Sequence, residues 1–121
     1  MIRKLFPVAL ALSLAAAFAL AQGEKKAATI TGYLLDNMCA ASLSSDAEAA
    51  KHYTSCSLMP ACAQTGYAVV SKDTVYKLDG RGNELAHALL KETKKKKGLA
   101  VTVEGTLEGD TLHADKLAEA R

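Results

Sequence analysis

The stretch that decides the fold reads Tyr67-Ala68-Val69-Val70-Ser71-Lys72-Asp73-Thr74-Val75-Tyr76-Lys77-Leu78. It holds two apolar runs on either side of the polar pair Lys72-Asp73. β-Branched and aromatic residues are typical of strands, and a polar pair between two such runs favours a hairpin. We therefore predict neighbouring antiparallel strands at 67–71 and 74–78.

Downstream of this hairpin, the pattern predicts a helix and two further strands. Asn83 can cap the helix, because apolar residues at helical spacing follow it. The helix is expected to run through the four lysines at 94–97 and to stop at Gly98. Alternating apolar residues then predict strands at 99–104 and 111–115.

The four lysines themselves allow two interpretations. Cations at the C-terminus of a helix complement the helix dipole, which we take as their main role. The second hypothesis is that they dock an anionic lipid or a cell-wall polymer.

Upstream of the hairpin, residues 29–36 have the composition of a first strand, and Gly32 within it suggests a bulge or a bend. Ser45 and Glu48 fit a capping box, which predicts the start of a short helix. Pro60 suits the first turn of another helix, which Gly66 would close.

The resulting order is strand, helical insertion, strand, strand, helix, strand, strand. This is the element order of the OB-fold, a five-stranded barrel. We therefore predict a mainly β protein with helices, in which residues 29–121 form a single OB-fold-like domain with a helical, cysteine-containing insertion between strands 1 and 2. An open α+β sheet with the same elements is the alternative.

The first 21 residues have the layout of a signal peptide: two basic residues, an apolar run and a small-x-small site that ends at Ala21. We predict export to the periplasm or beyond, with 22–28 as a disordered lead-in and no stable membrane insertion after cleavage. Cleavage removes Arg3 and Lys4, so 13 of the 15 basic residues remain against 13 acidic ones. The remaining domain is then neutral, and a neutral domain gives no electrostatic reason to expect binding of nucleic acid.

The chain also resembles a known family through short motifs. They are Gly32-Tyr33-Leu34-Leu35-Asp36-Asn37-Met38-Cys39, then Cys56, Cys62 and Gly66, and finally Val101-Thr102-Val103-Glu104-Gly105-Thr106-Leu107. This pattern resembles a family of small exported bacterial OB-fold-like domains of unknown function. The resemblance implies the same fold, and it implies that Asp36 and the three cysteines belong to the family's acidic-and-cysteine pattern.

All three cysteines, Cys39, Cys56 and Cys62, lie in the insertion. Cysteines of exported proteins normally pair, so we expect one disulfide and one remaining thiol. A Cys39–Cys62 bridge closes a longer loop than Cys56–Cys62 and gains about 1 kcal/mol in loop entropy. This margin does not decide between them.

A metal site is the second, more specific hypothesis for the same segment. Cys39, His52, Cys56 and Cys62 make a Cys₃His set, which is a known ligand composition for zinc. Met38 and Met59 add thioethers, which favour Cu(I). These two methionines and Asp36 are predicted to lie next to any bound ligand.

A catalytic thiol ranks last. Cys62 near a helix N-terminus would have a lowered pKa, and His52 could act as its base. No motif supplies an orienting third group, so we predict that the protein is not an enzyme. The sequence favours an exported binding or structural module, stabilised by a disulfide and without a cofactor, whose partner is an unknown small ligand or exported protein. A periplasmic zinc or copper protein is the alternative.

Overall fold

The computed structural model describes residues 25–121, so the predicted signal peptide lies outside the described residues. The elements follow one another as β1 (Lys26–Asp36), α2 (Asn37–Ala40), α3 (Asp46–Ala49), α4 (Thr54–Ser57), α5 (Pro60–Ala63), β2 (Tyr67–Ser71), β3 (Thr74–Leu78), α6 (Gly80–Glu92), β4 (Ala100–Glu108) and β5 (Thr111–Glu119). The protein is thus mainly β, with five strands and short helices, in the predicted order. Within the described residues, no helix is long and apolar enough to cross a bilayer.

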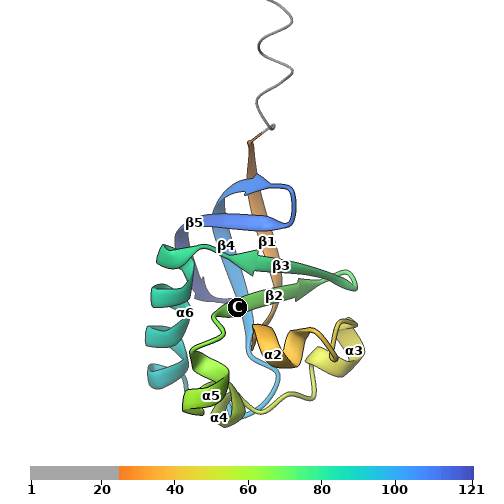
Figure 1. Cartoon of the computed structure of the whole chain (residues 1–121), viewed down its shortest axis with the longest axis vertical. Coiled ribbons are helices and arrows are strands. Elements are labelled where there is room, and N and C mark those ends of the chain that lie inside the picture. The colour runs from red at the N-terminus through yellow and green to blue at the C-terminus, as the bar shows by residue number, and fades with distance from the viewer. Residues whose placement is uncertain (1–24) are drawn as a thin grey trace, which may run out of the picture.

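The five strands form one mixed sheet (Figure 1). β1 pairs antiparallel with β4 along most of its length and with β2 at its C-terminal end. β2 and β3 form the predicted hairpin, β4 and β5 form a second antiparallel pair, and β3 lies parallel to β5 over a short stretch. The strand order is therefore β1-β2-β3-β5-β4, and β4 pairs in turn with β1.

Two local predictions are confirmed: the turn of the β2–β3 hairpin and the N-cap of the short helix in the insertion. Lys72 and Asp73 have φ values of 50° and 59°, the left-handed conformation that a tight two-residue hairpin requires. Ser45 is the N-cap of α3, where its Oγ accepts a hydrogen bond from Glu48 N at 3.2 Å. The Asp46 carboxylate then accepts from the backbone amides of Lys72 and Asp73, which fixes α3 against the hairpin turn.

Two apolar clusters bury both faces of the sheet where β1 and β2 pair. Leu34 and Val69 face the larger cluster, which contains residues from β4, β5 and α6. Leu35 and Val70 face the second cluster, with Ala40 of α2 and Ala49 of α3. This sandwich holds the C-terminal end of β1 rigidly, and the chain leaves it directly into α2.

The strands extend further than their local pattern indicates. Lys26 to Ala28 were predicted to belong to the disordered lead-in, but they are part of β1, because they pair with the end of β4 from Leu107 to Gly105. Such long-range pairing is invisible in a local window of sequence. The same effect lengthens β4 and β5, which pair with each other along almost their whole length.

The prediction for the long helix was wrong at both ends. Asp79, not Asn83, is the N-cap of α6, and its Oδ1 accepts from Gly82 N at 2.9 Å. Asn83 Oδ1 instead accepts from Tyr67 N at the start of β2. The helix ends at Glu92, so the lysines at 94–97 lie beyond its last turn.

Gly32 does not form a bulge, because the β1–β4 register is continuous through it. The register shift lies between Glu104 and Gly105 in β4. A Cβ atom at Gly32 would overlap the carbonyl oxygen of Val70. Glycine is therefore required by the close approach of β2 at the point where β1 passes from one partner strand to the other.

Candidate metal centre

Asp36 is the centre of the candidate site. It is the last residue of β1 and is completely buried. Its Oδ2 accepts from Cys39 N at 3.0 Å and so caps α2, while its Oδ1 accepts from Ser57 Oγ at 3.0 Å. Each carboxylate oxygen has two lone pairs, so both oxygens keep acceptor capacity after these bonds.

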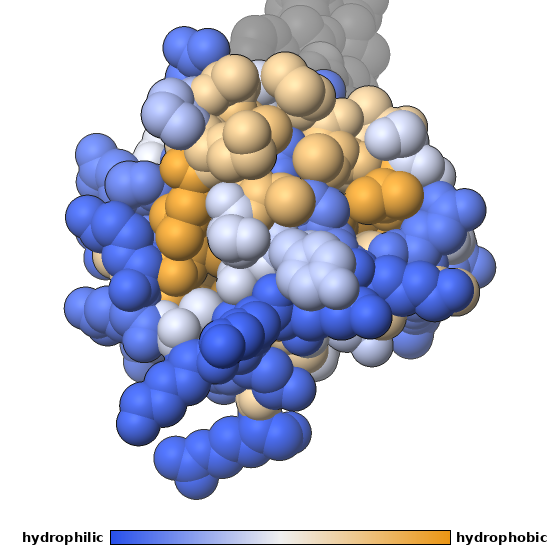
Figure 2. Space-filling view, turned by 90° about the horizontal axis from the view of Figure 1, so that it is seen from below, coloured by the Kyte–Doolittle hydropathy of each residue, from blue (hydrophilic) through white to orange (hydrophobic). Residues whose placement is uncertain are grey.

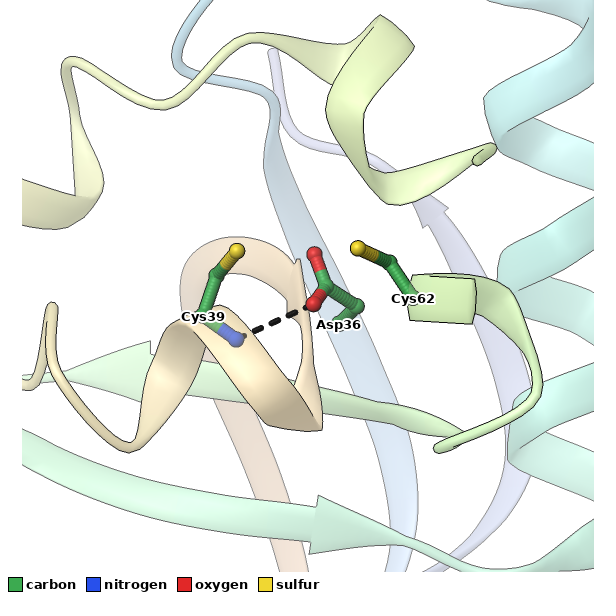
Figure 3. A group of neighbouring side chains, drawn as sticks. All are labelled: Asp36, Cys39 and Cys62. Carbon is green, nitrogen blue, oxygen red and sulfur yellow. Dashed lines mark hydrogen bonds between the residues drawn. The ribbon is translucent and has the colours of Figure 1, made fainter. Parts of the chain in front are cut away.

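Two thiols face this carboxylate from different helices. Cys39 belongs to α2 and Cys62 to α5. One carboxylate oxygen of Asp36 and the two sulfur atoms all lie within 4.8 Å of one another. Figure 3 shows the Asp36 carboxylate between the two thiols. Three donors of the kinds that bind zinc are thereby brought together, two of them three positions apart in the chain and the third, Cys62, from a separate helix.

His52 supplies a fourth donor beside the cluster. Its Nε2 lies 3.7 Å from Asp36 Oδ1, and only 7% of its side chain is exposed. This nitrogen is buried without a hydrogen-bond partner. An unpaired buried polar atom costs free energy, and this one lies close to Asp36, although it is not within 4.8 Å of all three donors.

The protonation state of His52 also suits a ligand. Burial lowers the pKa of His52, and the nearby negative charge of Asp36 opposes this shift only in part. The imidazole is therefore neutral at pH 7, and its contact with Asp36 is neither an ion pair nor, at 3.7 Å, a hydrogen bond. Neutral imidazole is the form that binds metal ions.

The thiols hold their protons in the metal-free protein. Burial, followed by the neighbouring Asp36 carboxylate, raises the pKa of Cys39 from 9.0 to about 12. Burial and the same carboxylate also raise the pKa of Cys62. The predicted lowering of the Cys62 pKa by a helix N-terminus is therefore wrong, because the thiol faces a carboxylate and α5 is a single turn. These shifts oppose an activated thiolate nucleophile.

A hydrogen-bonded frame holds the two thiol-bearing helices in place. Thr65 Oγ1 donates to the Cys62 carbonyl at 2.7 Å and accepts from Met38 N at 3.3 Å. Ser57, which bonds Asp36, is itself fixed because its carbonyl accepts from the Tyr67 hydroxyl at 3.0 Å. Sequence reasoning missed these roles of Ser57, Thr65 and Tyr67, since hydroxyl side chains carry no distinctive local signal.

The remaining predicted site residues lie around the cluster. Cys56, in α4, is outside the group of three. It lines a largely apolar pocket of about 270 Å³ together with His52. Met38 and Met59 are exposed by 53% and 55%. Of the predicted Cys₃His set, Cys39, His52 and Cys62 thus lie around Asp36, and Cys56 lies to one side.

All three cysteines are free thiols in the structure. Cys39 and Cys62 are nevertheless close enough, with sulfurs within 4.8 Å, to pair after a small movement. The disulfide remains a prediction, and Cys39 with Cys62 is one pair that the structure brings close together.

Comparison of the chain with protein-family models, with curated proteins and with solved structures gives no match.

Proposed function

We propose that this protein is a non-enzymatic, exported domain that binds one zinc ion through Asp36, Cys39, Cys62 and His52. One observation carries the proposal: three zinc-binding donor groups lie within 4.8 Å of one another beside a buried imidazole nitrogen that has no partner. A divalent cation would offset two of the three negative charges on the carboxylate and the two thiolates, and would satisfy the His52 nitrogen.

The donor set favours zinc over other metals. Thiolate, imidazole and carboxylate are all common zinc ligands, and four of them complete a tetrahedral site. Copper(I) prefers sulfur ligands alone, whereas calcium and magnesium prefer oxygen. A site with two sulfurs, one nitrogen and one oxygen lies between these extremes.

The fold that we propose around this site is the OB-fold. The five strands, the cyclic order of their pairings and the helix between β3 and β4 support it. The site then lies in the connection between the first two strands, a loop that often borders the ligand surface of OB-folds.

The second candidate function is a structural or binding module stapled by a Cys39–Cys62 disulfide. The distance between the two sulfurs favours it. The same sulfurs cannot form this bridge and bind zinc at once, so the two candidates exclude each other in any one molecule.

Zinc titration of the reduced protein against a chromophoric chelator tests the proposal. We expect one equivalent to bind tightly to the wild-type chain, and Cys39→Ser and Cys62→Ser to weaken binding by at least about a hundredfold. Cys56→Ser is the matched control and should bind as the wild type does, provided that circular dichroism shows all variants folded.

Two outcomes would overturn the proposal. One is the absence of tight zinc binding by the reduced wild-type protein. The other is an equal loss of affinity in Cys56→Ser and Cys62→Ser. Protein purified without reductant whose mass lacks two hydrogens, with a linked Cys39–Cys62 peptide, would support the disulfide module instead.

A further inference from the structure

Four consecutive lysines form the most concentrated charge on the described part of the chain. Lys94 to Lys97 follow α6 in the connection to β4, and all four side chains are exposed. Among residues 25–121, none of the four takes part in an ion pair. Four cations this close together repel one another, so other contacts are needed to hold the backbone of this segment in place.

The backbone of this lysine segment is fastened to the helical insertion. The carbonyl of Lys95 accepts from Thr54 Oγ1 at 2.9 Å, and that of Lys96 accepts from Thr54 N at 3.0 Å. Lys97 forms a β-bridge with Tyr53. The main chain is thus fixed while the four lysines stay exposed, which makes the segment a preformed cationic row.

An exposed tyrosine lies next to the cations. Tyr53 is 55% exposed, and its ring lies 5.6 Å from the Lys97 ammonium. Met38 and Met59 are the other exposed large hydrophobic residues of the described chain, and they belong to the same helical insertion. Figure 2, which views the molecule from below, shows hydrophobic surface and long hydrophilic side chains on one face.

We infer that this face docks on an anionic lipid surface. A cationic row alone would suit any polyanion, but the adjoining exposed tyrosine suits a surface that offers negative headgroups above an apolar interior. Tyrosine is favoured at such interfaces because its ring is apolar and its hydroxyl is polar. Docking is peripheral, and it is independent of the proposed zinc site.

Co-sedimentation with vesicles tests this inference. We expect the wild-type protein to bind vesicles of phosphatidylcholine mixed with phosphatidylglycerol, to bind pure phosphatidylcholine weakly, and to be released by salt. The triple variant Lys94→Gln/Lys95→Gln/Lys96→Gln should bind the anionic vesicles at least about tenfold less tightly. It keeps the backbone bonds to Thr54, so it should fold normally.

A matched variant distinguishes the effect of the local lysine row on vesicle binding from the effect of net charge. Lys72→Gln/Lys77→Gln/Lys116→Gln removes the same charge from exposed positions in the β2–β3 hairpin and in β5, and should bind anionic vesicles as the wild type does. An equal loss in both triple variants would overturn the inference.

A third variant separates lipid from a soluble polyanion. Tyr53→Ser should weaken binding to anionic vesicles and leave binding to dextran sulfate unchanged. Wild-type protein that binds dextran sulfate but not anionic vesicles would overturn the assignment to lipid.

Discussion

The Cys39 thiol lies where ionisation is strongly opposed, and this makes stability depend on pH. The unfolded chain releases the Cys39 proton near its usual pKa of 9.0, whereas the folded chain keeps it until the pH approaches about 12. The folded state therefore binds more protons in this window, so the free energy of unfolding of the metal-free protein should fall as the pH rises from 9.0 towards 12.

Urea unfolding of reduced protein with a chelator measures this effect. Cys39→Ser removes the titrating thiol and should flatten the decline between these pH values. The prediction fails if the two proteins lose stability with the same slope.

A different effect is predicted for His52, because its buried Nε2 has no hydrogen-bond partner that a substitution could remove. We expect His52→Leu to change the stability of the metal-free protein by less than about 1 kcal/mol, since it removes an unsatisfied polar atom. The same variant should weaken zinc binding by at least about tenfold. His87→Leu, on α6, is the control and should leave zinc affinity unchanged; equal losses in both variants would count against His52 as a ligand.

Residue type alone identified most of the candidate donors but not their centre. Cysteine and histidine have few ordinary roles, so Cys39, His52 and Cys62 could be selected from sequence. Asp36 could be placed only beside a ligand, because aspartate has many surface roles and its complete burial depends on the tertiary packing around it. The pKa of Cys62 was misjudged for the same reason, since the neighbour that raises it lies 26 positions away in Asp36.

At the scale of elements, the start of α6 depends on one side chain. Asp79 Oδ1 accepts from Gly82 N at 2.9 Å and from Ala114 N of β5 at 3.1 Å. We expect Asp79→Ala to lower the free energy of unfolding by about 1–2 kcal/mol, because it removes both a helix cap and a link to the sheet. Urea unfolding measures the loss, and the exposed Glu84→Ala is the control. Equal stability of the two variants would contradict the cap.

The crossing of β1 between its two partner strands depends on a missing side chain at Gly32. We expect Gly32→Ala to destabilise the protein by about 1–3 kcal/mol, because the added Cβ would overlap the Val70 carbonyl and force the strands apart. Gly80→Ala is the matched control, since a Cβ there meets nothing within 4 Å. Thermal unfolding compares the two; equal melting temperatures would show that the strands adjust without cost.

Elements with local signals could be predicted, and those with distant causes could not. Ser45 with Glu48 and the pair Lys72-Asp73 contain their own capping and turn chemistry, so both were located correctly. Asn83 looks like a cap in sequence, but its carboxamide is used by Tyr67 N on another strand. The helix end was misplaced because the lysine segment is held by Thr54, 41 positions from Lys95.

At the scale of the whole molecule, the candidate site exists because the sheet is covered on both faces. The larger cluster and the second cluster hold the end of β1 between them, and Asp36 follows immediately. The helical insertion returns across the second cluster and so brings His52 and Cys62 back to that end. Element order could be predicted from the sequence, but this return path could not, because it depends on how four short helices pack.

The most direct test of the account is the number of sulfur atoms bound to zinc, measured by X-ray absorption at the zinc edge on the reduced, zinc-loaded protein. The proposed site predicts two sulfur ligands at about 2.3 Å and two nitrogen or oxygen ligands at about 2.0–2.2 Å. Cys56→Ser should leave this spectrum unchanged. Three sulfur ligands would place Cys56 in the site instead of Asp36, and a shell without sulfur would contradict the metal centre altogether.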